Sequence, residues 1–575
     1  MNDNEQQGQR KALQDRHQHP YSRRRRRTSY RATHSAQEQA SQSKESLAPQ
    51  ENTSATNGTN RRQRQRQRRQ SRDIERQAGT ISTENSQAPK NVRLLRPHRI
   101  LFIGMSVFLA LFSVAMPYLS SVANGFQSQS LYTGYMFTQG TLPYADIYST
   151  GGLLYYALIA ISYLLGSSAW LLVINVLAFY VSGVYLYKII TYLTGRRDAA
   201  VGLVSIFYLL NYGLGFGGLY PIQWAMPFIF LSVWYLVKYF DDATTDEAFV
   251  IYGFTGALGL LIEPRTMLFW IISFMVILGY SFYQRRFARG IYQALGTIFG
   301  SLLVIYTAVY FILNLQILSG YINQAGFGLL TNFAIATNNV FLTFIYQLAM
   351  AAASGLLIGF LALSKRSAYA NKHRFIKVVL MVMLVTSLFP VLLSQTFQLY
   401  DLLLLLPYGI ILASVVVTTT DEMNEETMVG QDSPFVSYFT HHFYLPYIVV
   451  ILGVLFPLVS SLMQMGTARE RTTVANYIRQ NTTTSDSIYV WDNNASVYLI
   501  SQRRAASHII LPTVNNASTS NQQLLNDELL QNAALYVVVN NTQQLTTEIS
   551  KDLSSNYDLV SVDQINHFTI YRKKA

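Results

Sequence analysis

The sequence predicts an α-helical polytopic membrane protein of about eleven spans, with a basic tail before the spans and a small α/β domain after them. Half of the 575 residues are hydrophobic and only 13% are charged, against about a quarter in ordinary soluble domains. The net charge of +13 is confined to residues 1–99, which hold 22 basic and 9 acidic side chains. The rest of the chain is therefore neutral, and a single soluble domain is excluded. Without cysteine, the chain forms no disulfide and has no thiolate nucleophile.

The tail, residues 1–95, is predicted to be disordered and cytoplasmic. Its first 90 residues are mostly Gln, Ser, Thr, Asn and Arg, and they cannot bury enough apolar surface to offset the loss of chain entropy. Two basic clusters, Arg23 to Arg27 and Arg61 to Arg69, suit anionic lipid head groups. RNA binding, or a solvated tail that only helps to set the topology, are the alternatives.

The first span is predicted at Ile100 to Leu119, directly after Arg93, Arg96 and Arg99. Twenty apolar residues span about 30 Å as a helix, the thickness of the hydrocarbon core. The run lies too far from residue 1 for a cleaved signal peptide, so we expect a signal anchor. Its basic flank predicts that the tail stays in the cytoplasm.

Ten further apolar runs complete the transmembrane domain, residues 96–466. They lie near 169–190, 199–212, 221–239, 248–262, 266–283, 291–313, 339–362, 375–391, 399–417 and 443–464. An odd number of spans places the C-terminus outside, and the Lys/Arg clusters of the loops fall on the cytoplasmic side in this register. The chain is thus expected to be a multi-pass protein of the cell membrane.

One long outer loop, residues 120–168, is expected between the first two spans. It contains two shorter apolar segments, Leu131 to Gln139 and Leu153 to Leu165, which we interpret as interfacial helices because they are too short to cross a membrane. Counting Leu153 to Leu165 as a span gives the alternative of twelve spans.

Residues 467–575 are predicted to form an extracytoplasmic α/β domain. Short apolar strands are expected at 487–490, 508–511, 534–539 and 568–571, with helices at 521–531 and 546–553 between them. Nine basic and nine acidic residues make this domain neutral, so specific nucleic-acid binding is not expected.

Only four charges between residues 100 and 465 fall outside the predicted cytoplasmic loops. They are Asp146, Glu263, Arg265 and Asp401, and all four lie on the outer side or at the outer end of a span. Ionisable groups at membrane depth are costly and mark a functional site by default. The sequence therefore predicts that these four side chains converge on one outward-facing cavity.

Asp146 is the predicted catalytic residue. It lies in a Gly- and Pro-punctuated loop between Tyr144 and Tyr148, and a lone carboxylate there suits a general base that deprotonates an acceptor hydroxyl. The two flanking tyrosines are predicted to bind the substrate. The alternative is a loop Asp that caps the following helix.

Arg265 and Glu263 occupy a short turn between two spans, and Asp401 begins a Leu-rich span. The planar guanidinium suits a phosphate group, so these residues are predicted to bind the substrate. A mutual ion pair is the alternative for Glu263 and Arg265, and helix capping is the alternative for Asp401. The residues do not indicate a metal site; a divalent cation as cofactor is left open.

The first outer loop resembles that of the GT-C-fold glycosyltransferases, the superfamily of protein O-mannosyltransferases, the aminoarabinose transferase of lipid A and bacterial envelope sugar transferases. The resemblance rests on Gly140-x-x-Pro-Tyr-x-Asp146, on Gly-Gly-Leu-Leu-Tyr-Tyr156, on the turn Glu-Pro-Arg265, and on Asp486-Ser-Ile-Tyr-Val-Trp491 with Val497-Tyr-Leu-Ile-Ser-Gln-Arg503 in the last domain. It covers roughly residues 95–575.

This resemblance implies a GT-C-like fold and transfer of a sugar from a polyprenyl-phosphate donor. It implies that Asp146 acts on the acceptor, that Arg265 binds the donor phosphate, and that Arg503 or Arg504 faces the site from the last domain. The sequence departs from the family pattern because Ile follows Asp146 and because the loop Asn211 to Gln223 has no acid. Both departures weigh against a protein acceptor and a metal-dependent site.

The predicted function is thus a membrane glycosyltransferase that moves a sugar from a lipid-linked donor to an envelope acceptor: a polysaccharide, a teichoic acid, a glycolipid or a protein. Its expected partners are this donor, this acceptor and the anionic head groups around the tail. The alternatives are a transporter or flippase for an envelope lipid or glycan, and a non-catalytic membrane scaffold.

Overall fold

A computed structural model describes residues 92–326, 340–363, 373–392, 397–414, 444–512, 515, 519–563 and 565–574. These residues belong to one compact unit, Ser86–Ala575. The tail up to residue 91, with both basic clusters, lies outside the described residues, and so do the internal stretches 327–339, 364–372, 393–396 and 415–443. The predictions for the tail therefore stay predictions.

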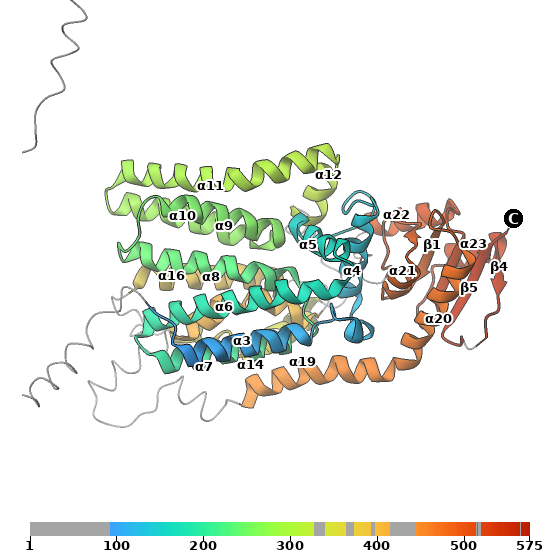
Figure 1. Cartoon of the computed structure of the whole chain (residues 1–575), viewed down its shortest axis with the longest axis horizontal. Coiled ribbons are helices and arrows are strands. Elements are labelled where there is room, and N and C mark those ends of the chain that lie inside the picture. Colours follow the sequence, from blue (N-terminus) through green and yellow to red (C-terminus); the bar gives the residue numbers. More distant parts are fainter. Residues whose placement is uncertain are drawn as a thin grey trace, which may run out of the picture. The chain divides into compact units, whose positions relative to one another are not determined.

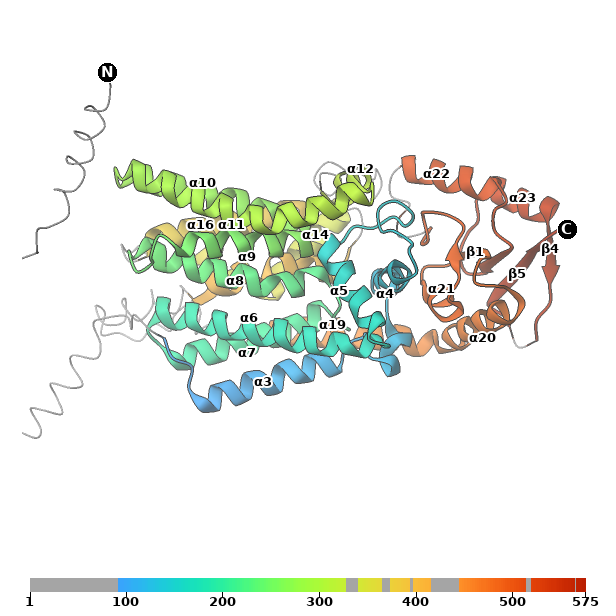
Figure 2. The same ribbon diagram turned by 45° about the horizontal axis from the view of Figure 1, so that its top comes forward.

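Apolar helices, most of them long, form the first part of the described chain (Figure 1). Their bounds are α3 Arg96–Leu111, α6 Leu171–Thr194, α7 Arg197–Leu214, α8 Pro221–Phe240, α9 Ala248–Ile262, α10 Met267–Tyr283, α11 Phe287–Asn314, α14 Val340–Ala353, α15 Ile358–Leu363, α16 Arg374–Leu392 and α19 Tyr444–Met463. Both views show α6, α8, α9 and α11 running alongside one another (Figure 2).

Small residues bring α9 and α11 into close contact. A Cβ atom on Gly253 would lie 1.9 Å from the carbonyl oxygen of Thr297, and one on Gly300 would lie 1.9 Å from that of Val250. Close backbone approach at small residues is the usual way in which membrane helices pack, since lipid gives no hydrophobic drive for their association.

Five of the described helices are long and apolar enough to cross a membrane. They are Ser168–Thr194, Pro264–Tyr283, Phe287–Asn314, Arg374–Leu392 and Leu445–Met463. Every region predicted as a span is at least partly helical in the described residues. The helical architecture is thus confirmed, whereas the count of eleven spans stays a prediction.

Three predicted spans differ in detail. The first was expected to reach Leu119, but α3 ends at Leu111 because Val114 N–H donates to the carbonyl of Gly217 at 2.8 Å and turns the chain away from the helix axis. The span 339–362 is interrupted at Gly355, whose φ of +80° is incompatible with helix. The span from 399 begins as the 3-10 helix η6 Leu399–Leu404, and α-helix follows over 406–414.

Both short apolar segments of the long loop are helices. The first is longer than expected: α4 spans Gly125–Thr138, because Asn124 caps its N-terminus by accepting a hydrogen bond from Gln127 N–H at 2.9 Å. The second is α5, Leu153–Leu164. Between α3 and α4 lies the 3-10 helix η1, Pro117–Val122.

The last hundred residues form a small α/β domain, as the sequence predicts, and its sheet has five strands where four were expected. The strands are β1 Ser487–Trp491, β2 Arg504–Ala505, β3 Tyr536–Asn540, β4 Tyr557–Val560 and β5 Phe568–Lys573, in the order β2-β1-β3-β5-β4. β1 is parallel to β2 and β3, and β5 is antiparallel to β3 and β4. The helices are α20 Met465–Asn481, α21 Ser496–Ser501, α22 Thr519–Leu530 and α23 Thr547–Asn556.

The predicted strand 508–511 is wrong. Its apolar side chains are buried, but Arg504–Ala505 occupies the sheet edge beside β1 instead. The carbonyl of His508 accepts a hydrogen bond from Tyr148 N–H of the long loop at 2.9 Å, so this segment bonds to the loop rather than to a strand. Apolar content alone could not distinguish the two uses.

Candidate functional site

Three of the four charges that the sequence singled out meet at one point. Arg265 donates to Glu263 through Nε (3.0 Å) and Nη2 (2.9 Å), and to Asp401 through Nη1 (3.1 Å). The side chains of Glu263, Asp401 and Arg265 are 1%, 14% and 25% exposed. The sequence left two roles open for Glu263 and Arg265, a mutual ion pair and substrate binding. The ion pair is present, and two N–H groups of Arg265 have no hydrogen-bond partner among the described residues.

Asp146 makes no contact with this ion cluster among the described residues and lies in a tightly closed loop. Its carboxylate Oδ2 accepts from Leu142 N–H at 2.7 Å, and its own N–H donates to the Leu142 carbonyl at 2.9 Å. The carboxylate thus closes a turn on its N-terminal side and does not cap α5. Asp146 is nevertheless exposed, so its second oxygen is open to solvent.

The two tyrosines beside Asp146 shape the loop. Tyr144 has a positive φ of 69° and is buried, and its hydroxyl donates to the Gly151 carbonyl at 2.6 Å. Tyr148 is half-buried and packs against apolar residues of the α/β domain. A residue that the sequence analysis missed, Gln324, joins both ends of the loop, because it donates to the Tyr144 carbonyl at 2.9 Å and accepts from Ser149 N–H at 2.8 Å.

The Asp146 loop and the Glu263–Arg265 turn meet at Gly152. Its N–H donates to the carbonyl of Ile262 at 3.1 Å, one residue before Glu263. A Cβ atom on Gly152 would lie 2.0 Å from the carbonyl oxygen of Leu261. Only glycine therefore fits here, and this contact is what brings the first loop motif to the turn that carries Arg265.

The α/β domain touches the Asp146 loop through His508. Its Nδ1 contacts Glu528 Oε1, and its N–H donates to Glu528 Oε2 at 2.9 Å. The bond to Glu528, aided by the negative charges of Glu528 and Asp146, raises the pKa of His508. Burial would raise the pKa of Glu528, but hydrogen bonds from His508 and Ser507 outweigh it and lower the pKa.

Arg503 and Arg504 hold the α/β domain together and fasten it to α4. Arg503 is buried and donates to Thr482 Oγ1 at 2.7 Å and to carbonyls of its own domain. Arg504 is exposed and donates to the Gln139 carbonyl at 3.3 Å. Among the described residues, neither guanidinium contacts the Glu263–Arg265–Asp401 cluster. The role of Arg503 and Arg504 in substrate binding therefore stays a prediction.

A polar cavity of about 340 Å³ is lined in part by Tyr400, the residue directly before Asp401 of the ion cluster. Its wall comes from the start of α4 and the segment before it, the end of α7, the loop before α8, the segment before Asp401, the last turns of α19, α20 and the end of β1. The polar lining residues are Ser121, Asn124, Gln127, Tyr220, Gln398, Tyr400, Ser460, Ser461, Gln464, Arg471, Asn493 and Asn494. No charged motif in the sequence marks this cavity.

Side-chain amides fix the wall of the cavity. Gln127 Nε2 donates to the carbonyls of Phe216 and Gly218 at 2.9 and 2.8 Å, and Asn124 Nδ2 donates to the Tyr220 hydroxyl at 2.9 Å. The rings of Tyr220 and Tyr400 stack with centroids 4.7 Å apart. In the sequence, amide side chains gather at the predicted outer ends of apolar runs. These amides carry no charge, so the criterion that singles out stranded charges does not detect them.

No three His, Asp or Glu side chains among the described residues are arranged to hold a metal ion. Glu263 and Asp401 both direct oxygens to Arg265, which supplies the positive charge between them.

Three solved structures similar to the chain are archaeal oligosaccharyltransferases from Archaeoglobus fulgidus. One, AglB in complex with an inhibitory peptide and a dolichol-phosphate, is 12% identical with a TM-score of 0.44, over 83% of this chain and 74% of that chain. The others, tethered with an acceptor peptide and in the apo form, are 13% and 12% identical with TM-scores of 0.41 and 0.42, each over 77% of this chain and 69% of that chain. No curated protein matches the chain.

Two family descriptions cover nearly all of the described chain. Residues 87–465 match "Putative competence-induced protein Ccs4 N-terminal domain", and residues 468–574 match "Putative competence-induced protein Ccs4 C-terminal domain". The boundary between them falls at the start of α20, where the apolar helices end. The chain therefore belongs to the Ccs4 family.

Proposed function

We propose that this protein is a membrane glycosyltransferase that moves a sugar from a polyprenyl-phosphate donor to a cell-envelope acceptor on the outer face of the membrane. The observation that carries the proposal is the meeting of Glu263, Arg265 and Asp401 beside a polar cavity. Charges buried at membrane depth are retained against a substantial desolvation cost, and this cost is the reason to assign them a role.

The reaction needs a cation at the leaving phosphate and a base at the acceptor. The acceptor hydroxyl oxygen attacks the anomeric carbon, the bond from that carbon to the phosphate oxygen breaks, and the polyprenyl phosphate leaves with the electron pair. Arg265 would stabilise the leaving phosphate through its two unpartnered N–H groups. The hydroxyl proton would pass to the carboxylate of Asp146.

The Gly152–Ile262 contact supports this division of roles. It joins the loop that carries Asp146 to the turn that carries Arg265, so the two groups would act on opposite ends of the same transfer. Tyr144, Tyr148, Glu263 and Asp401 would then position these two groups. The tail would lie in the cytoplasm and the α/β domain outside, as the positive-inside pattern predicts.

The test is Asp146→Asn in cells that lack the native copy, with the envelope glycan profile as readout. The change keeps the side-chain shape and the turn acceptor but removes the base, and loss of a general base lowers a rate about 10²–10⁴-fold. Asp563→Asn, an exposed Asp of the α/β domain, is the matched control. An unchanged profile, with the mutant protein present in the membrane, would refute the catalytic assignment.

A further inference from the structure

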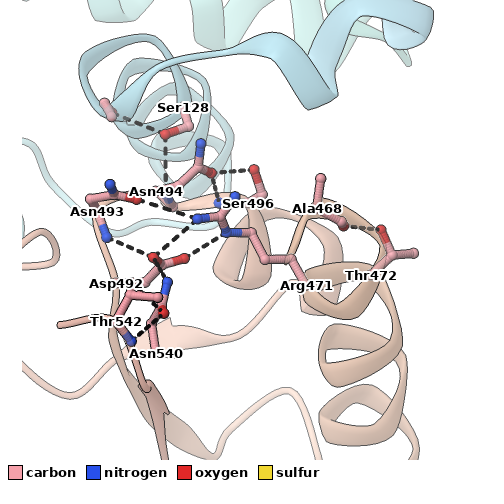
Figure 3. Close-up of polar contacts among 12 residues, drawn as sticks. Ser128, Ala468, Arg471, Thr472, Asp492, Asn493, Asn494, Ser496, Asn540 and Thr542 are labelled. Carbon is pink, nitrogen blue, oxygen red and sulfur yellow. Dashed lines mark hydrogen bonds and ion pairs between the residues drawn. The ribbon is translucent and has the colours of Figure 1, made fainter. Parts of the chain in front are cut away.

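The polar cavity beside Tyr400 has an unusual lining, because it combines many polar groups with almost no net charge. Among its described lining residues only Arg471 is charged. Its guanidinium is buried and donates to Asp492 through Nε (2.6 Å) and Nη2 (3.1 Å), and Asp492 is fully buried. Figure 3 shows Arg471 reaching from α20 to this carboxylate at the end of β1. The charge is thus neutralised inside the wall.

The same ion pair fixes the wall on the side of the α/β domain. Arg471 Nη2 also donates to Asn493 Oδ1 at 3.3 Å, and Asp492 accepts from Asn493 N–H at 2.8 Å (Figure 3). Asn494 Nδ2 donates to the Ala123 carbonyl at 2.8 Å, which ties the end of β1 to the segment before α4. This side of the cavity is therefore preorganised by buried polar contacts.

Several groups of the lining remain available to a ligand. The side-chain amide of Gln398, Nδ2 of Asn493 and the hydroxyl of Tyr400 have no hydrogen-bond partner in the part of the chain that the structure describes. An amide offers both a donor and an acceptor, and a hydroxyl does the same. Such groups match ligand hydroxyls, which also donate and accept, better than they match a group of fixed charge.

We propose that this cavity binds a neutral, polyhydroxylated ligand, a saccharide unit without a charged substituent. Its volume of about 340 Å³ lies at the small end of the range for small-molecule sites, about 300–1,000 Å³. The stacked rings of Tyr220 and Tyr400 give it an aromatic wall, and the negative face of an aromatic ring attracts the C–H groups of a sugar. A uronate or an amino sugar would lose its hydration without gaining a counter-charge.

This inference deepens the proposed function, because it names the class of saccharide, but binding can be measured without transfer. The experiment uses the full chain in lipid nanodiscs and saturation-transfer NMR with N-acetylglucosamine, glucose, glucuronate and glucosamine. We expect the two neutral sugars to bind at least tenfold more tightly than the two charged ones. Equal or tighter binding of a charged sugar, or no binding of either neutral sugar at millimolar concentration, overturns the proposal.

Two variants locate the binding. Gln398→Ala removes a free amide and should weaken binding of N-acetylglucosamine about 2- to 10-fold, the usual worth of one neutral hydrogen bond. Gln531→Ala, an exposed Gln at the end of α22, is the control. Ser461→Phe fills the cavity and should abolish sugar binding. The melting temperature of this variant should equal that of the parent protein. Full binding by Ser461→Phe would place the sugar elsewhere and overturn the proposal.

The outcomes separate this inference from the proposed function. Neutral sugars bound by a chain that transfers nothing would refute the transferase and leave the cavity assignment standing. Transfer of a charged sugar would support the transferase and refute the cavity assignment.

Discussion

Arg471 and Asp492 form a buried ion pair that joins α20 to the end of β1, with Nε 2.6 Å from Oδ2. Asn540 Nδ2 donates to the same carboxylate at 2.8 Å, so three elements of the α/β domain share one charge (Figure 3). Since α20 directly follows the last apolar helix, α19, this pair also fixes how the chain enters the sheet domain.

Breaking this pair from one side should destabilise the protein strongly. Arg471→Met leaves Asp492 buried and unpaired, and loss of one partner of a buried pair costs about 3–5 kcal/mol. The double variant Arg471→Met/Asp492→Leu removes both charges and should recover much of that loss. Thermal unfolding of the full chain in detergent measures both. A double variant as unstable as the single one would show that the polar network, and not the unpaired charge, sets the cost.

Gly152→Ala should separate the first loop from the Arg265 turn. The added Cβ would lie 2.0 Å from the Leu261 carbonyl oxygen, so the loop must shift away from the end of α9. Overpacking of this kind lowers the free energy of unfolding by about 1–3 kcal/mol. The proposed transfer rate should fall by a larger factor than the amount of folded protein does. Gly104→Ala is the control, because nothing lies within 4 Å of its added Cβ. Normal activity of Gly152→Ala would remove this contact from the mechanism.

Arg265→Lys should impair donor binding more than folding. Lysine keeps the positive charge between Glu263 and Asp401 but lacks the planar fork that bonds both carboxylates and a phosphate together. We expect a higher KM for the lipid-phosphate donor, measured with purified protein in nanodiscs. Arg286→Lys, in an exposed pair with Asp242, should change neither KM nor stability. An unaltered KM in Arg265→Lys would argue that Arg265 only compensates the two acids.

The His508–Glu528 pair should make stability depend on pH. Because the pKa of His508 is raised, this residue stabilises the folded protein below its ordinary pKa of 6.5, and the stabilisation is lost as the pH rises through the raised pKa. Because the pKa of Glu528 is lowered, this residue stabilises the folded protein above its ordinary pKa of 4.5, and the stabilisation is lost as the pH falls through the lowered pKa. The pair therefore stabilises most between pH 4.5 and 6.5.

Glu528→Gln tests this dependence. It removes the negative charge that raises the pKa of His508, so the melting temperature should vary less across this pH window than in the parent protein. Glu548→Gln, an exposed acid in the first turn of α23, is the control. Identical pH profiles of Glu528→Gln and the parent protein would contradict the prediction.

The helices and most strands followed from the sequence alone, because their signals are local. The apolar runs inside α9 and α11, helices of 15 and 28 residues, need no partner to be recognised. The sheet order did not follow, since β4 and β2 are short and their places depend on partners far along the chain. The end of α3 at Leu111 likewise depends on Gly217, more than a hundred residues away.

The sequence by itself determined that this is a helical membrane chain with a small α/β domain, and it singled out Glu263, Arg265 and Asp401, because charge in an apolar run is costly wherever the run folds. Tertiary structure decided that these three side chains meet and that Asp146 closes a separate loop. It also made the neutral cavity visible, because its wall combines groups that are unremarkable singly, such as Gln398 and Asn493, and only packing places them around one space.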